Sequence, residues 1–105
     1  MRAVEKGLKM QTVEWDEEKN KINIKKHGIS FQTARLVFAD ENLLMIPDTK
    51  HSVYEERYKV IGKIGRKKII LVVCTDRVNA IRIISARQAN TYERGLYYDS
   101  LNASI

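Results

Sequence analysis

The chain has 105 residues, of which 44% are hydrophobic and 30% are charged; these values are typical of one folded domain and exclude a disordered chain. Its formal net charge of +6 favours a polyanionic partner, either nucleic acid or an acidic protein, although a basic surface can also serve solubility alone. A single cysteine excludes an intramolecular disulfide framework and fits a reducing cytoplasm, and no apolar run has the length of a membrane span.

The folded part of the chain is expected to begin after a short arm. Residues 1–12 carry charges without a clear period and lack the apolar core of a secretory signal. We therefore expect a poorly ordered arm or an extension that arises from upstream translation. Residues 13–105 then form a single domain, which opens with a short strand over Val13–Trp15.

Two helices are expected next. Asp16 is a suitable N-cap for the first, and acidic residues follow it in the first turn, where the helix dipole favours negative charge. This helix runs to about His27, because Gly28 can adopt the left-handed conformation that ends a helix. Ser30 caps a second helix, whose apolar residues recur at helical spacing and should face the core. These core residues are Phe31, Ala34, Val37 and Phe38.

Four strands and a final helix are expected in the rest of the chain. The apolar and β-branched runs that predict the strands are Leu43–Ile46, Glu56–Lys63, Ile69–Thr75 and Ala80–Ala86. Asn90 and Glu93 form a capping-box pattern, which predicts a last helix to about Leu101. The order β-α-α-β-β-β-β-α predicts an α+β fold in which a meandering antiparallel sheet carries helices mainly on one face.

The last predicted strand carries the clearest candidate site. Arg82 and Arg87 flank Ser85 there, and Arg77 precedes the strand. Guanidinium groups keep their charge and match the geometry of phosphate, so the arginines predict a cationic clamp for a phosphodiester. An offset of five residues would turn Arg82 and Arg87 to opposite faces of an ideal strand, unless the strand ends before Arg87. The alternative is that each arginine pairs with a surface carboxylate.

Further residues are candidates for proton transfer or charge stabilisation. Glu56 would act as a general base if Arg57 or another arginine lay near it, and otherwise the two residues form a solvated strand face. His27 has the side chain type that titrates near neutral pH, so it is a candidate acid or base, although a histidine at this helix end also serves as a cap. The catalytic candidates are Glu56, Arg57, Arg77, Arg82, Arg87 and His27.

Lysines on the first helix are candidates for contacts with a nucleic-acid backbone. Lys19, Lys25 and Lys26 would neutralise phosphates without reading sequence, or would form a solvated face or a docking surface for an acidic partner. Ser85 is a further RNA-binding candidate because it lies between the arginines. Tyr92 of the last helix can stack on RNA or anchor a protein interface.

No residue pattern indicates a metal site or a cofactor. His27 and His51 lack paired spacing, and Cys74 stands alone in an apolar run that predicts a buried strand position. There is no glycine-rich phosphate loop. Cleavage of RNA can proceed without metal, because a base, an acid and a cation that stabilises the charged phosphorane are sufficient. We therefore expect metal-free chemistry with no cofactor.

Six segments together resemble a known family. They are W-D-E-E-K-N from Trp15, K-H-G-I-S-F from Lys26, E-E-R-Y from Glu55, V-V-C-T-D-R from Val72, I-R-I-I-S-A-R over Ile81–Arg87 and Y-E-R over Tyr92–Arg94. This ordered set, spread over Val13–Tyr98, resembles the BrnT-type toxins of bacterial type II toxin–antitoxin systems. The resemblance implies a RelE-like fold, metal-independent endonucleolytic cleavage of RNA and inhibition of translation in the cytoplasm.

The resemblance also implies partners and site residues. A cognate ribbon-helix-helix antitoxin, similar to BrnA, would neutralise the toxin and contact DNA on behalf of the pair, and the toxin would dimerise within the complex. The motif positions carried over as site candidates are His27, Glu56, Arg57, Arg77, Arg82, Ser85 and Arg87. The rival interpretation is a non-catalytic basic module that docks an acidic partner or takes part in transcriptional autoregulation.

Overall fold

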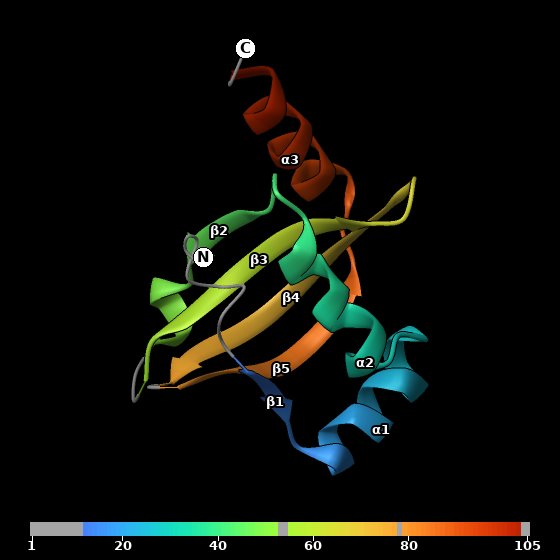
Figure 1. Ribbon diagram of the computed structural model, residues 1–105, viewed down its shortest axis with the longest axis vertical. Helices are drawn as coiled ribbons and strands as arrows, with labels where there is room; N and C mark the ends of the chain where they lie inside the picture. Colours follow the sequence, from blue (N-terminus) through green and yellow to red (C-terminus); the bar gives the residue numbers. More distant parts are fainter. Residues whose placement is uncertain (1–11, 53–54, 78, 104–105) are drawn as a thin grey trace.

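The structure is a computed structural model that describes residues 12–52, 55–77 and 79–103. The arm expected over residues 1–12 lies, apart from Thr12, outside the described residues. The elements in chain order are β1 (Thr12–Trp15), α1 (Glu17–His27), α2 (Phe31–Ala34), the 3-10 helix η2 (Arg35–Ala39), β2 (Leu44–Pro47), the 3-10 helix η3 (Thr49–His51), β3 (Arg57–Ile64), β4 (Lys68–Arg77), β5 (Ala80–Gln88) and α3 (Thr91–Ala103) (Figure 1). The predicted order of helices and strands is therefore confirmed, with η3 added.

The five strands form one mixed sheet in the order β1-β5-β4-β3-β2 (Figure 1). The strands from β2 to β5 pair with their chain neighbours in antiparallel fashion, as a meander does. The expectation of a wholly antiparallel sheet is wrong for β1, which pairs in parallel with β5. A parallel pair needs a long connection, here residues 16–79, and no local pattern specifies such a pairing.

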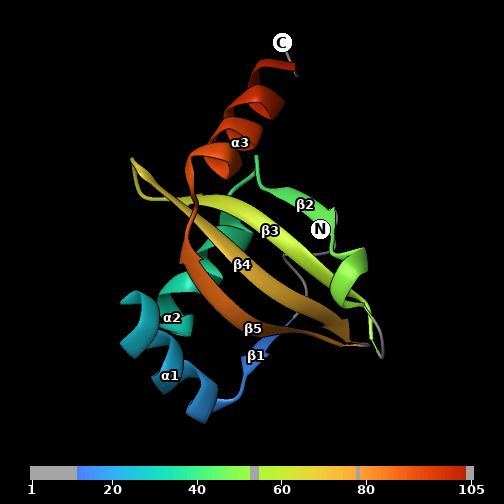
Figure 2. The same cartoon turned by 180° about the vertical axis from the view of Figure 1, so that it is seen from behind.

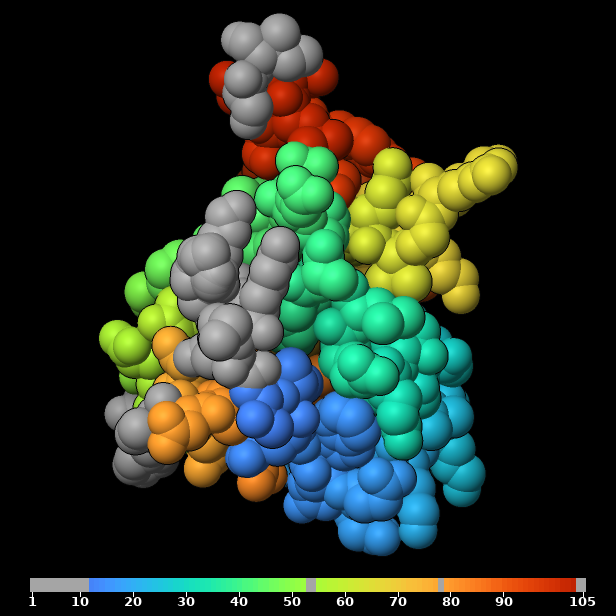
Figure 3. Space-filling view, in the orientation of Figure 1, coloured from blue at the N-terminus to red at the C-terminus, as the bar shows by residue number. Residues whose placement is uncertain are grey.

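Helices cover the two faces of the sheet unequally. On one face α1, α2 and η2 supply a core in which Phe31, Ala34 and Val37 are completely buried (Figures 1 and 3). On the other face α3 packs at one end, where Tyr97 lies against Ile61 and other strand residues. The prediction of helices mainly on one face is thus correct for α1 and α2 and wrong for α3. The remainder of the second face has no helix over it (Figure 2).

The predicted helix ends are confirmed by backbone contacts. The Asp16 carboxylate accepts hydrogen bonds from the first-turn N–H groups of Glu18 and Lys19, and Gly28 ends α1 with a φ of 71°. At α3, the N–H of Glu93 donates to the Asn90 side chain while the Glu93 carboxylate accepts from the Asn90 N–H, each at 2.8–2.9 Å. This reciprocal pair is the predicted capping box.

Two buried asparagines, rather than an apolar stripe, attach α1 to the rest of the molecule. The Asn23 amide donates to the carbonyls of Ala86 and Ile29 and accepts from the N–H of Ala86, at 2.8–3.1 Å. Asn20 accepts from the N–H of Phe31 at 2.8 Å. Asn23 therefore forms the backbone hydrogen bonds to Ala86 that a neighbouring strand would otherwise form, in the part of β5 that β1 does not reach.

Replacing Asn23 with alanine should lower the free energy of unfolding by roughly 3 kcal/mol, because the buried N–H and C=O of Ala86 would lose their partner. Urea denaturation measures this loss. Asn102→Ala is the matched control: Asn102 is exposed in the last turn of α3, and its replacement should change stability by no more than about 0.5 kcal/mol. Equal effects of the two substitutions would show that Asn23 does not anchor α1.

Candidate active site

A β-bulge decides which side chains of β5 share a face. In the β4–β5 ladder Val73 is opposite Ser85, whereas the next residue, Cys74, is opposite Ile83, so Ile84 is the extra residue. Side chains alternate along a strand, and one extra residue restores the same face after an odd offset. Arg82 and Arg87 therefore lie on the same face of the sheet, although β5 continues past Arg87. The bulge resolves the conflict that the ideal alternation predicts.

Three rows of side chains cross this face. Taken from β3 across β4 to β5, they are Arg57–Thr75–Arg82, Lys59–Val73–Ser85 and Ile61–Leu71–Arg87. The first row is polar, and β1 adds Glu14 beside Arg82 in it, whereas Ile61 and Leu71 of the third row are buried with Tyr97 of α3. We call the surface formed by Glu14, Arg57, Lys59, Arg82, Ser85 and Arg87, with the buried Thr75 between Arg57 and Arg82, the open face. Because neighbouring strands lie about 4.8 Å apart, the backbones that carry the cations of β3 and β5 are separated by roughly 10 Å.

Arg82 forms an ion pair on the open face but keeps donors to spare. Its Nε donates to Oε2 of Glu14 at 3.0 Å, and the side chains of both residues are about one-third exposed. Neither Nη nitrogen of Arg82 has a hydrogen-bond partner in the described part of the chain. The pair therefore holds the Glu14 carboxylate in place and leaves a guanidinium edge for a ligand.

Arg87 differs from Arg82, because both of its Nη nitrogens are bound by the Glu93 carboxylate. Its two Nη nitrogens donate to the two oxygens of Glu93, both at 2.8 Å. The hydrogen bonds from Arg87 hold the pKa of Glu93 below its ordinary value, although partial burial opposes this. The same pairing raises the pKa of Arg87. Arg87 thus secures the start of α3 and is not a free phosphate clamp.

Arg57 and Lys59 are the cations of this face that form no ion pair, although the charge of Lys59 contributes to lowering the pKa of Glu93. Both are half-buried on β3, and neither forms an ion pair within residues 12–52, 55–77 and 79–103. Lys59 lines a pocket of about 320 Å³ under the start of α3, together with Tyr92, Glu93 and the apolar residues Ile46, Ile61, Leu71 and Leu96. Unneutralised cations beside a pocket are suited to bind an anionic group.

The Thr75 hydroxyl is an unsatisfied polar group at the centre of the first row. Thr75 is 1% exposed, and its Oγ1 has no hydrogen-bond partner among the described residues. A buried hydroxyl without a partner is uncommon and costs stability. Its ladder neighbours are Arg57 and Arg82. The hydroxyl therefore lies between the two arginines, buried rather than exposed to a ligand.

Two predicted catalytic residues, Glu56 and His27, lie away from the open face. Glu56 directly precedes β3 and accepts a hydrogen bond from Tyr58 at 3.0 Å, a bond that raises the pKa of Tyr58. Tyr58 packs on the helix-covered face, opposite to Arg57, because successive residues of a strand alternate. The condition for Glu56 as a base, a nearby arginine, is therefore not met among the described residues.

Arg77 and His27 are the remaining catalytic candidates. Arg77 ends β4 two residues after Thr75, so it borders the open face, where it pairs with the similarly exposed Glu55 at 3.3 Å. His27 ends α1, where it is exposed beyond the edge of β5. The surface-pairing alternative considered for the arginines is thus correct for Arg77, for Arg87 and in part for Arg82.

The RNA-binding candidates divide between two surfaces. Lys19, Lys26 and His27 line a groove of about 180 Å³ between α1 and β5, which also includes Ser85. Lys25 is exposed on α1 but does not line this groove. Tyr92 is exposed at the start of α3, beside the pocket of Lys59.

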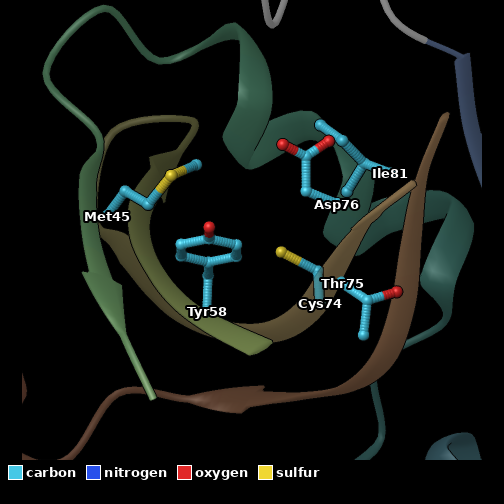
Figure 4. A pocket seen from close by; sticks show the side chains of 6 residues that line it. All are labelled: Met45, Tyr58, Cys74, Thr75, Asp76 and Ile81. Atoms are coloured by element: carbon cyan, nitrogen blue, oxygen red, sulfur yellow. The ribbon is translucent and has the colours of Figure 1, made fainter. Parts of the chain in front are cut away.

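A third pocket, of about 150 Å³, lies on the helix-covered face and has no cationic lining (Figure 4). The sulfur of Cys74 points into it near Tyr58, whereas the side chain of Thr75 turns away. Burial raises the pKa of Cys74 to about 12, so the thiol is protonated at neutral pH and is a poor nucleophile. Without a cation among its lining residues, this pocket is poorly suited to phosphate.

Sequence reasoning missed Glu14, Lys59 and Thr75 as members of the site. Lys59 could have been found from the alternation of β3, which places it on the face of Arg57. Glu14 could not, because its contact with Arg82 depends on the parallel pairing of β1 with β5. No group of three or more metal-binding side chains was found within the described residues. Among the described helices, none is long and apolar enough to cross a membrane.

Comparisons with known proteins agree with the resemblance found in the sequence. A family model described as the ribonuclease toxin BrnT of a type II toxin–antitoxin system matches residues 15–93. The structure is similar to the crystal structure of the Brucella abortus ribonuclease toxin BrnT, with 28% sequence identity, a TM-score of 0.61, and coverage of 77% of this chain and 99% of that chain. None of the curated proteins matches the chain. The chain therefore belongs to the BrnT family, the ribonuclease toxins of type II toxin–antitoxin systems.

Proposed function

We propose that this chain is an endoribonuclease that cleaves RNA on the open face without a metal ion and thereby inhibits translation. The observation that carries the proposal is the β-bulge at Ile84, which brings Arg82 and Ser85 onto the face of Arg57 and Lys59. An anionic backbone laid across these strands would meet cations on both sides. Family membership supplies the RNA target.

The chemistry we assign is attack of a ribose 2′-oxygen on the adjacent phosphorus. A base removes the 2′-hydroxyl proton, the bond from phosphorus to the 5′-oxygen breaks, and an acid protonates that oxygen. The products are a 2′,3′-cyclic phosphate and a 5′-hydroxyl. Arg57 is placed to stabilise the additional negative charge of the phosphorane, because no carboxylate among the described residues neutralises it.

We assign the base to Glu14 and the acid to Lys59. Three carboxylates border the open face: Glu14, Glu55 and Glu93. Glu55 lies beyond its end, outside β3, and is paired with Arg77, and Glu93 is already occupied by two bonds from Arg87 and one from the N–H of Asn90. Glu14 accepts one bond, from Arg82, and its second oxygen has no partner in the described part of the chain. Of the cations there, lysine can release a proton whereas arginine cannot, which favours Lys59 as the acid.

The partner we propose is a ribbon-helix-helix antitoxin that neutralises the toxin in the cytoplasm. Membership of a type II system implies an antitoxin, and the positive net charge of the chain is suited to an acidic segment of it. Contact with DNA would occur only through the antitoxin, and the toxin would dimerise within that complex. We also propose that the sheet and its helices form a RelE-like fold.

Incubation of the purified protein with RNA, with and without a chelator, tests the proposed activity. We expect cleavage at an unchanged rate in the chelator, fragments that end in 2′,3′-cyclic phosphate, and growth arrest when the protein is expressed alone. Cleavage that stops in the chelator would contradict the metal-free mechanism. RNA that stays intact over long incubation, together with tight binding of the antitoxin, would support the rival non-catalytic module.

A further inference from the structure

The groove between α1 and β5 lies where β1 no longer pairs with β5, so that this end of β5 is an edge of the sheet. β1 follows β5 only as far as the pair Trp15 and Ile83, and beyond it Asn23 of α1 binds the backbone of Ala86. The helix runs beside this end of β5 (Figure 2). The groove that remains has a volume of about 180 Å³ and is lined by Lys19, Ile22, Asn23, Lys26, His27, Ile84 and Ser85.

Two lysines of this groove have no carboxylate partner. Lys19 and Lys26 occur seven residues apart and so share one side of α1. Neither forms an ion pair within the described ranges, whereas Lys21, on another side of the helix, pairs with Glu18 at 3.5 Å. The groove therefore has two unneutralised positive charges at its wall.

Ser85 joins the groove to the open face. It lines the groove, and it also belongs to the row that begins at Lys59 on β3. The bulge at Ile84 is what places Ser85 on the open face. The row that runs from Lys59 through the uncharged Val73 and Ser85 thus links the cations of β3 to the lysines of α1, and no acidic residue lines the groove.

We propose that this groove is a second RNA subsite, which holds a backbone phosphate outside the bond that is cleaved. The inference rests on the proposed function, since the RNA must already lie on the open face. A second subsite at this position requires a substrate of single-stranded RNA that is long enough to reach from β3 to α1. Ile22, which is 59% exposed, and Ile84 give the groove an apolar wall against which a ribose or base packs. A flexible single strand can follow the turn over the edge of β5, unlike a rigid duplex.

The test compares two double variants that remove the same charge from the full chain. Lys19→Ala/Lys26→Ala removes the groove lysines, and Lys21→Ala/Lys67→Ala removes exposed lysines elsewhere. Fluorescence anisotropy measures binding of 2′-O-methyl RNA, which lacks the attacking hydroxyl, at lengths of about 3 and about 12 nucleotides. For the longer RNA we expect the groove variant to lose roughly tenfold in affinity and to reduce the salt slope by about 0.7, the value for one lost phosphate contact on a single strand.

The control variant should retain the affinity and the salt slope of the parent chain. For the short RNA, the groove variant and the parent chain should differ far less in affinity than they do for the long RNA. Equal losses in the two double variants, or equal losses for the two RNA lengths, would overturn the second subsite. If the parent chain cleaves unmodified RNA and the two double variants lose the same affinity, only the proposal of a second subsite is overturned. If the parent chain leaves unmodified RNA intact, the proposed function fails.

Discussion

Replacing Arg57 with alanine should lower the rate of RNA cleavage by roughly 10²–10³-fold, the usual cost of losing one donor to a transition-state charge. Arg57 is half-buried on the open face, its guanidinium has no ionic partner among the described residues, and the orphaned Thr75 hydroxyl lies next to it in the ladder. Since no ion pair is broken, the free energy of unfolding should change little. Single-turnover cleavage and urea denaturation measure the two quantities.

Arg66→Ala is the matched control for Arg57→Ala. Arg66 is exposed in the turn between β3 and β4, which projects from the body of the molecule (Figure 3). Its replacement removes the same charge, so a general electrostatic effect on RNA would appear in both variants. A rate for Arg57→Ala that equals the rate for Arg66→Ala would exclude Arg57 from the reaction.

Replacing Glu14 with glutamine should slow cleavage roughly a hundredfold or more, which is the range for loss of a general base. Glutamine keeps the shape of the side chain and an oxygen for Arg82, but it cannot take the 2′-hydroxyl proton. Single-turnover cleavage by the parent chain and by the glutamine variant measures the difference.

Glu55→Gln provides the comparison for this prediction. Glu55 pairs with Arg77 as Glu14 pairs with Arg82, and the two glutamates have similar exposed fractions, 42% and 38%. A slower rate in Glu55→Gln would mean that any lost ion pair reduces activity. If Glu14→Gln keeps the parent rate, another group takes the proton.

The elements that local patterns control were predicted well. Asp16, Gly28 and Glu93 act at the helix ends as predicted, because caps depend on residues a few positions apart. The alternation of residues along β3, a local property, likewise puts Tyr58 and Arg57 on opposite faces. These features need no knowledge of the remainder of the fold.

Features that depend on distant parts of the chain could not be predicted. The parallel pairing of β1 with β5 and the bulge at Ile84 follow from how the whole sheet closes, and together they assemble the open face. The side of α1 that faces the sheet could not be predicted either, because it is formed by Asn20 and Asn23 rather than by apolar residues. Its isoleucines Ile22 and Ile24 are exposed instead.

The candidate site was predicted by residue type more than by role. Arginines were identified as the cationic wall, yet Arg87 serves to hold α3 through Glu93. Lys59, which no motif singled out, is unpaired beside the pocket. Ion pairing is decided in three dimensions, so a sequence can indicate which cations exist but not which of them stay free.

The location of the bound RNA tests the central claim most directly. Backbone amide chemical shifts of the full chain, recorded as 2′-O-methyl RNA is added, report which face the ligand contacts. The open-face account predicts shifts at Arg57, Lys59, Thr75 and Ser85, with none at Val37 in η2 on the covered face. Shifts confined to the helix-covered face, with Arg57 and Thr75 unchanged, would contradict it.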